Sequence, residues 1–596
     1  MPTSTILRRV VLIFLFCLIA LPFTAFAQEE WSVRVLKEKN VDKKEEIVCV
    51  SGNKGVRAET LVELVSRERH GPAVVSTAGQ YFEKSALDQS TPEVVRLVAK
   101  RPDIASQALA YAALSPKASQ LIVGFAGSAK KEDQRIAARM LAATALMRDP
   151  QGPAKKKLAE KRGDDEDAKL NVDYRVEIEK LLNTTQDEVA LEYLLLTVGV
   201  DRVMAVKDAI GQHAGSKNKA VAMAAQYALA STKQSVDEAA ILRAITTWPK
   251  QKKARPALSY DPRQTPRIYA MMAAGEARLE SAGEPLLELV NDKDLHNAVY
   301  ATRALSQIGG EGLATQVLSM MNEDTPWPVR VAIYDAAGAN PDKAAVALLQ
   351  NHFNDENGRF RQDALYALLS IAAGQAQGMT IEAFNEWWSI SGDDFEVDPK
   401  ATRKWRSENA VGDAQVEPIA GFYESGIISE RPVFSVDASK SMKGAQIESL
   451  KQTLNEVVSS FPARVKFNIV DFGGHVRTLA PGGMIPAKNR KQAMEQFTYE
   501  IELTLGTRTY DAIERAMNIP DMDSVHFLSD GAPYGSHLKS WSRIDHATRL
   551  FCSTAPIAVH VIYYPEPGRK VKEKTVKPIR KYAKAHAGGF FVIESE

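Results

Sequence analysis

Hydrophobic positions follow one period in the middle of the chain and another near its end. From about residue 60 to about residue 390, Ala and Leu recur at the spacing of one helix face. Beyond about residue 430, short continuous apolar runs alternate with amphipathic segments. The first pattern predicts α-helices, and the second predicts strands that alternate with helices. We therefore expect a multidomain chain, with an all-α part followed by an α/β part.

A sequence repeat runs through the helical part. Asp292, Asp324 and Asp355 lie 32 and 31 residues apart, and each begins a segment that holds two helical stretches. Arg330 and Arg361 hold matching positions after their aspartates. Self-similarity at this period, with two helices in each unit, predicts an α-solenoid. Small residues at the facing positions let paired helices approach closely and stack.

This repeat resembles HEAT-type repeats, clearly over residues 290–375 and less so over 185–235. The resemblance implies a HEAT-like solenoid, a kind of scaffold or protein-binding array, and we expect it to occupy residues 61–390. A charged run at 152–169 interrupts the array. It is either a solvated insertion, the commoner case for such a run, or a binding loop.

The array is expected to end with a helix near residues 380–390. This helix carries Phe384, Trp387 and Trp388 on one face, because their spacing of three and four residues matches the helical period. Two interpretations stay open: the aromatic side chains seal the open core of the last repeat, or they form a partner-binding patch. The polar segment 391–420 that follows is interpreted as a linker.

Residues 421–596 are expected to form the α/β domain. The pattern predicts strands at 433–436, 465–470, 476–479, 524–528, 557–563 and 590–593. It predicts helices between them at 446–461, 488–503, 509–517, 540–551 and 571–586. Continuous apolar strands that alternate with helices favour a mainly parallel, doubly wound (Rossmann-like) sheet covered on both faces. In such sheets ligands bind beyond the carboxyl ends of the strands.

Oxygen-bearing side chains follow two of these predicted strands. Asp437, Ser439 and Ser441 come directly after the strand 433–436, and Asp530 follows the strand 524–528. Carboxylate and hydroxyl oxygens, with water, suit hard cations such as Mg²⁺. Asp471 ends a third predicted strand on the same edge, where it either supports the site through water or only terminates the strand.

Residues 431–596 resemble a von Willebrand factor type A domain, through three motifs in the family's order. The first is D-x-S-x-S at residues 437–441, the second is Gly506-Thr507 ahead of a predicted helix, and the third is Leu528-Ser529-Asp530-Gly531. The resemblance implies a metal-ion-dependent adhesion site. Its ligands would be Asp437, Ser439, Ser441, Thr507 and Asp530.

The chain departs from the family's pattern at two positions around this site. Lys440 stands where many members have glycine, and Leu505 stands where many have the first of two glycines. Neither change removes a ligand, and Lys440 places a cation beside the first metal loop. Thr509 also follows Gly506, and we expect it to cap the helix 509–517.

The resemblance also implies a function. The expected metal is Mg²⁺, with Mn²⁺ and Ca²⁺ as alternatives, and a Glu or Asp carboxylate of a protein partner would take its open coordination position. We therefore expect a non-enzymatic scaffold protein that recruits an acidic partner. The alternative is an accessory subunit of an enzyme assembly of the chelatase or ATPase type. The sequence contains no P-loop, H-E-x-x-H or G-x-S-x-G motif.

The first 27 residues have the pattern of a signal peptide. Two arginines precede an apolar stretch, and Ala25-Phe26-Ala27 matches a cleavage site. We expect export to the periplasm or cell envelope, or secretion, with membrane attachment only if the segment stays uncleaved. Residues 28–60 are left unassigned. With a net charge of +1, bulk charge gives no reason to expect nucleic acid as a partner. Whether Cys49 and Cys552 pair stays open.

Overall fold

The computed structural model describes residues 174–202, 206–247, 264–376, 378–530, 541–552, 556–565 and 571–593, with a few more between 128 and 138. By their contacts, residues 1–121 and 122–596 are separate units, and every described element lies in the second. The predicted signal peptide, the segment 28–60 and the charged run 152–169 lie outside the described residues. So do Cys49 and the beginning of the predicted array.

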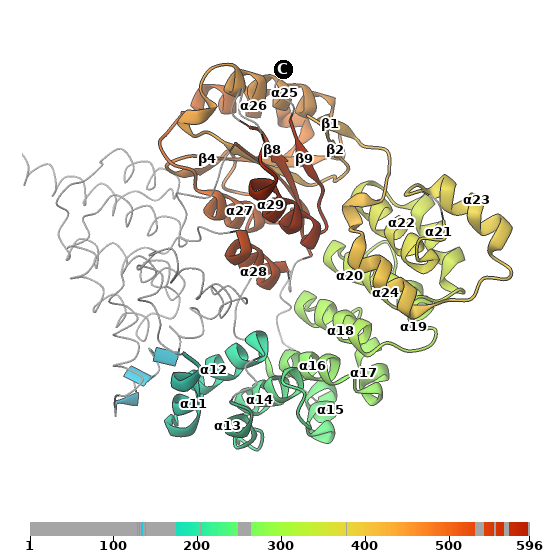
Figure 1. The fold of residues 1–596 in the computed structure, drawn as a ribbon, viewed down its shortest axis with the longest axis vertical. Helices are drawn as coiled ribbons and strands as arrows, with labels where there is room; N and C mark the ends of the chain where they lie inside the picture. The colour runs from blue at the N-terminus through green and yellow to red at the C-terminus, as the bar shows by residue number, and fades with distance from the viewer. Residues whose placement is uncertain are drawn as a thin grey trace, which may run out of the picture. The chain divides into compact units, whose positions relative to one another are not determined.

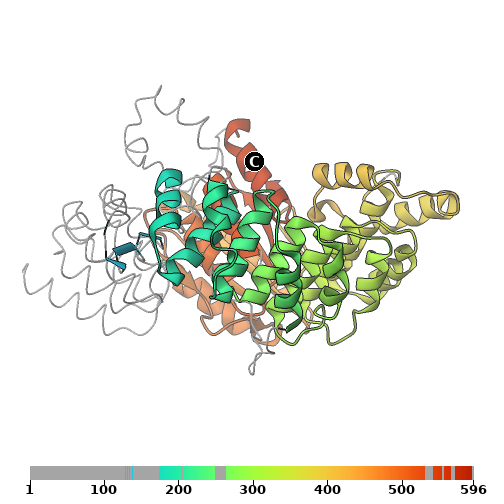
Figure 2. The same cartoon turned by 90° about the horizontal axis from the view of Figure 1, so that it is seen from below.

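The described part of the chain between residues 174 and 408 is helical. Its helices are α11 (Tyr174–Thr184), α12 (Glu188–Asp201), α13 (Lys207–Gly211), α14 (Lys219–Ser231), α15 (Glu238–Thr247), α16 (Pro266–Ala277), α17 (Gly283–Leu287), α18 (Leu295–Ile308), α19 (Leu313–Ser319), α20 (Trp327–Ala339), α21 (Ala345–Asp355), α22 (Gly358–Ala372), α23 (Ile381–Ser391) and α24 (Pro399–Glu408). The longer helices α12, α14, α16, α18, α20 and α22 each pack on the next, and Figure 2 shows the row. A helical part ahead of the α/β part is confirmed, while its predicted bounds and the HEAT-type assignment stay predictions.

Side-chain caps begin several of these helices. Asp187, Asn218, Thr265 and Asp294 each accept a hydrogen bond from a backbone N–H in the first turn that follows. Asp292 of the predicted repeat lies two residues before such a cap and accepts the N–H of Asp294 at 2.8 Å. Of the repeated aspartates, Asp292 and Asp324 lie in turns between helices, whereas Asp355 is the last residue of α21.

Small residues let neighbouring helices approach closely, as the repeat predicts. A Cβ added to Gly275 of α16 would lie 3.1 Å from Cα of Ala304 in α18. A Cβ added to Gly338 of α20 would lie 3.1 Å from Cα of Ala367 in α22. At these two positions the backbone of one helix meets the backbone of the next, so a larger side chain has no free space.

Replacing Gly338 with valine is expected to lower the free energy of unfolding by about 1–3 kcal/mol, the usual effect of overpacking. Gly211 of α13 provides the matched control, because a Cβ added there meets nothing within 4 Å. Urea unfolding followed by circular dichroism measures both variants. Equal, small effects of Gly338→Val and Gly211→Val would contradict the close helix contact.

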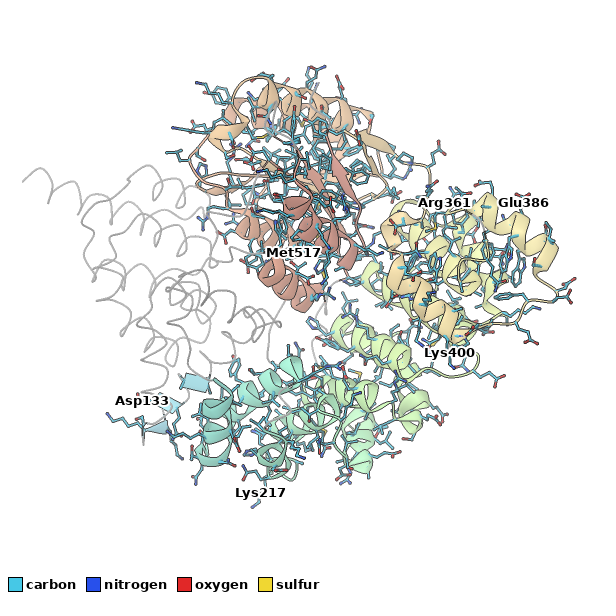
Figure 3. All side chains as sticks on the ribbon, in the orientation of Figure 1. Asp133, Lys217, Arg361, Glu386, Lys400 and Met517 are labelled. Carbon is cyan, nitrogen blue, oxygen red and sulfur yellow. The ribbon has the colours of Figure 1, made fainter. Side chains whose placement is uncertain are left out.

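The end of the array carries a cluster of aromatic side chains. Thr380 caps α23, and Phe384 is buried. Phe384 stacks on Trp388 at 6.0 Å between ring centroids, and Trp387 meets Phe395 edge to face at 5.1 Å. The aromatic rings thus form one packed cluster. In Figure 3, Glu386 of the same helix points outward.

The segment predicted as a linker contains a helix. Asp398 caps α24 and accepts hydrogen bonds from the N–H groups of Lys400 and Ala401, at 2.8 and 3.2 Å. Thr402 is its buried residue, so the helix has almost none of the apolar periodicity by which sequence patterns reveal helices. Capping and contacts with α22 and α20 hold it instead.

The second part of the chain is an α/β domain built on a mainly parallel sheet, as predicted. Its strands are β1 (Ala420–Phe422), β2 (Ser425–Ile427), β3 (Pro432–Asp437), β4 (Lys466–Phe472), β5 (Val476–Thr478), β6 (Ile485–Pro486), β7 (Ser524–Ser529), β8 (Ala558–Tyr563) and β9 (Phe590–Val592). The main sheet has the order β5-β4-β3-β7-β8-β9, and β6 pairs with β4. The pairs β3–β4, β3–β7, β7–β8 and β8–β9 are parallel, whereas β5 and β6 run antiparallel to β4. Strands β1 and β2 form a separate hairpin that the pattern did not predict.

Helices cover both faces of this sheet (Figure 1). They are α25 (Ala445–Ser460), α26 (Arg490–Glu500), α27 (Thr509–Met517), α28 (Trp541–Cys552) and α29 (Glu573–Ala585). One apolar cluster joins the sheet to α25 and α26, and a second joins it to α27, α28 and α29. Met517, labelled in Figure 3, is buried in the second cluster at the end of α27.

A buried arginine connects the helical array to the α/β domain. Arg359 of α22 is only 4% exposed and donates a hydrogen bond from Nη1 to the carbonyl oxygen of Asp523, at 2.5 Å. Its Nε also lies 3.4 Å from Oδ2 of Asp363. Asp523, directly before β7, is buried as well and accepts a hydrogen bond from Ser429. Burial raises the pKa of both carboxyl groups, that of Asp363 to about 7, and Arg359 opposes the rise.

None of the helices in the described part of the chain combines the length and the apolar composition that a membrane crossing requires.

Candidate metal site

Asp437 is the last residue of β3, so it lies where the carboxyl ends of the parallel strands meet, and it is fully buried. Strand β7 lies beside β3, with Leu528 opposite Val436. Asp437 therefore meets Ser529, whose Oγ donates a hydrogen bond to Oδ2 at 2.8 Å. The backbone N–H of Ser439 donates to Oδ1, also at 2.8 Å. These two bonds fix the orientation of the carboxylate.

Asp530 directly follows β7 and is 8% exposed, so two carboxylates share one edge of the sheet. The pKa of Asp437 is raised to about 7, first by burial and second by the charge of Asp530. Two buried carboxylates that repel each other are stabilised by a cation between them. The pair thus fits a divalent metal ion.

Two hydroxyl groups stand beside these carboxylates. Oγ of Ser439 lies 2.8 Å from Oγ of Ser441, across a single turn of 3₁₀-helix at Lys440–Met442. Ser439 is buried, whereas Ser441 is exposed. The first loop therefore runs from the buried edge of the sheet to the surface, which is the layout needed for a metal that a partner can reach.

The second predicted loop is held against the first by its backbone. The N–H of Lys440 donates to the carbonyl oxygen of Thr504 at 2.9 Å, and the N–H of Thr504 donates to that of Ala438 at 3.0 Å. Gly506 has φ +111°, a conformation that glycine adopts readily. Thr507 follows, half buried, on this anchored loop.

Helix α27 begins differently from the sequence prediction. Thr509 is its first residue rather than its cap; the N-cap position belongs to Arg508, which makes no side-chain cap bond. Arg508 instead pairs with Asp511, at 2.5 Å from Nη2 to Oδ2, and both side chains are fully buried. The pattern R-x-x-D at the start of a predicted helix was the available signal for this pair. A buried pair of this kind rigidifies the chain directly after Thr507.

Asp471 does not terminate its strand, which was one of its two predicted roles. Strand β4 continues to Phe472, so Asp471 lies within the strand rather than at its end. Its Oδ2 accepts a hydrogen bond from Nε of Arg477 at 2.8 Å. Arg477 also pairs with Glu500 of α26 at 2.8 Å. Asp471 is thus part of an ion-pair network that ties β4, β5 and α26 together.

The histidines of the sheet are core residues. The rings of His526 and His560 stack at 4.5 Å, and burial lowers the pKa of both. Neutral rings in the core suit this environment. Within the described residues, no group of three or more His, Cys, Asp and Glu side chains could hold a metal ion. A metal at the sheet edge would depend on two carboxylates and on hydroxyl groups.

Among the comparisons with known proteins, a family model supports this domain. No curated protein matches the chain. A crystallised engineered protein covers 64% of this chain and 97% of its own length, at 18% identity and a TM-score of 0.31, and so low a score supports no inference. Residues 431–557 match the family model of the von Willebrand factor type A domain. The chain therefore joins a helical array to a von Willebrand factor type A domain.

Proposed function

We propose that this chain is an exported, non-enzymatic scaffold that recruits an acidic protein partner through a divalent cation. A type A domain indicates a role in protein–protein interaction. The observation that carries the finer proposal is the pair of buried carboxylates, Asp437 and Asp530, at the ends of two neighbouring strands. Their repulsion gives the site a reason to bind a cation.

Each proposed ligand has a distinct task. Asp437 and Asp530 would supply the negative charge, and the hydroxyl groups of Ser439, Ser441 and Thr507 would supply neutral oxygens. Mg²⁺ prefers six oxygen ligands and usually keeps some water. Because neutral hydroxyl and water oxygens supply its other ligands, the metal would stay electrophilic, and a carboxylate from a partner would replace an exchangeable water. The exposed Ser441 marks the side from which that partner would approach.

To test the proposal, the full chain is immobilised, and the proteins that it retains are compared in Mg²⁺ and in EDTA. We expect a set of proteins to be retained in Mg²⁺, released by EDTA, and absent when Asp437→Ala replaces the wild type. Asp521→Ala is the matched control, because Asp521 is an exposed aspartate just before the opposite end of β7. Retention of the same proteins in EDTA, or by Asp437→Ala, would refute metal-dependent recruitment.

A further inference from the structure

One exposed leucine stands directly at the predicted metal site. Large apolar side chains exposed among the described residues are Ile390, Tyr499, Leu505 and Val571. Leu505 is 69% exposed and directly precedes Gly506 of the second metal loop. A single exposed leucine needs no explanation by itself. Its position beside the second metal loop places it where a partner bound at the metal would make contact.

The backbone fixes Leu505 at this place. The preceding residue, Thr504, exchanges two backbone hydrogen bonds with the first metal loop, at 2.9 and 3.0 Å. Its Oγ1 also accepts the N–H of Gly474 at 2.7 Å. On the other side of Leu505, Gly506 packs close to Gly474. A Cβ added to Gly506 would lie 3.4 Å from Cα of Gly474. The chain around Leu505 is therefore anchored.

A lysine accompanies this leucine. One of the two backbone bonds of Thr504 comes from the N–H of Lys440, so Lys440 and Leu505 lie on adjacent, hydrogen-bonded segments. Lys440 is exposed between the two serines of the first loop. Among the described residues, no carboxylate forms an ion pair with Lys440. An exposed apolar side chain and an exposed cation thus lie on the two hydrogen-bonded loops that carry predicted metal ligands.

We propose that Leu505 and Lys440 select the partner, which presents an acidic segment with an apolar side chain beside the metal-binding carboxylate. This inference rests on the proposed function. The apolar side chain of the partner would cover Leu505, removing apolar surface of both molecules from water. A second Glu or Asp of the partner would face Lys440, and this charge complementarity would favour acidic segments over neutral ones.

The test uses fluorescein-labelled hexapeptides and fluorescence anisotropy with the full chain in Mg²⁺. The peptides are Gly-Gly-Asp-Gly-Gly-Gly, Gly-Gly-Asp-Leu-Gly-Gly and Gly-Gly-Asp-Leu-Glu-Gly. We expect the leucine peptide to bind about threefold to tenfold more tightly than the glycine peptide, from partial burial of one side chain. The glutamate peptide is expected to bind more tightly than the leucine peptide. This difference in affinity is expected to shrink with added salt, because salt screens the attraction to Lys440.

Matched variants assign each preference to its residue. Leu505→Ser is expected to reduce the ratio between the leucine and glycine peptides to about one, and Leu505→Phe is expected to retain it. Ile390→Ser removes an even more exposed apolar side chain, from α23, and is expected to leave the ratio unchanged. Lys440→Gln is expected to remove the gain from glutamate, whereas Lys443→Gln, two residues beyond Ser441, keeps it.

The outcomes separate this inference from the proposed function. If no peptide binds in Mg²⁺, or if EDTA does not weaken binding, the proposed function fails and the inference fails with it. If the aspartate peptides bind only with Mg²⁺ but show no preference for leucine or glutamate, the proposed function stands and the inference is overturned. A preference that survives both Leu505→Ser and Lys440→Gln also overturns it.

Discussion

Replacing Arg359 with methionine is expected to lower the free energy of unfolding by about 3–5 kcal/mol, the effect of breaking a buried ion pair on one side only. Methionine keeps much of the apolar volume and removes the charge. The carbonyl oxygen of Asp523 then loses its donor at 2.5 Å, and the buried carboxylate of Asp363 loses its cation. Urea unfolding followed by circular dichroism gives the size of the loss.

The loss is expected to grow with pH. Burial raises the pKa of Asp363 to about 7 from the ordinary value of 3.8, so the folded chain holds a proton that the unfolded chain releases. The stability from that proton is present at low pH and is lost as the pH rises through this range. Without Arg359 the pKa of Asp363 rises further. Arg359→Met should therefore lower the free energy of unfolding more at pH 8 than at pH 5.

The control for this prediction is Arg580→Met. Arg580 pairs with Glu573 at 2.9 Å, but its side chain is 52% exposed. Exposed pairs contribute about 0–1 kcal/mol, so this variant should unfold almost as the wild type does. A comparable effect of the two variants, or a loss at Arg359 that does not depend on pH, would contradict the buried arrangement.

Mg²⁺ is expected to raise the melting temperature of the wild-type chain and to leave that of Asp530→Asn unchanged. A ligand present at 100 times its dissociation constant stabilises the folded state by about 2.7 kcal/mol. Asparagine keeps the shape of the side chain but removes one of the two charges that the cation would balance. Differential scanning fluorimetry in Mg²⁺, Mn²⁺, Ca²⁺ and EDTA measures the shift and ranks the three cations.

The same variant has a second expected effect. In EDTA, Asp530→Asn should melt at a higher temperature than the wild type, because the charge of Asp530 no longer repels Asp437. Asp521→Asn serves as the control and should respond to Mg²⁺ as the wild type does. A wild type whose melting temperature does not respond to any of the three cations would remove the basis for a metal site.

Much of the α/β domain could be predicted from the sequence, because its strands are continuous apolar runs. Strand β3 is buried at every residue, and so is β7. Such runs stand out against the amphipathic helices between them. Strand β6, with two residues, and the hairpin β1–β2 are too short to leave a pattern. Helix α24 was missed because its capping and its contacts, rather than an apolar stripe, hold it.

The candidate site shows the same division. Asp437 and Asp530 could be placed at one edge because the topology of a parallel sheet brings strand ends together, and the structure places them so. The Arg508–Asp511 pair and the bond of Asp471 to Arg477 depend on how loops and helices pack against the sheet. A loop conformation is decided by tertiary contacts, which local sequence patterns do not encode.

The position of β3 and β7 in the sheet has a mechanical consequence. Both are interior strands: β3 lies between β4 and β7, and β7 lies between β3 and β8. A partner that pulls on the site along these strands would have to shear several hydrogen-bond ladders together, rather than unzip one edge bond by bond. At the other end of β7, Arg359 of α22 donates a hydrogen bond to the carbonyl oxygen of Asp523. A force applied along β7 at the predicted site would thus pass through its hydrogen-bond ladders to Asp523 and, through Arg359, to α22.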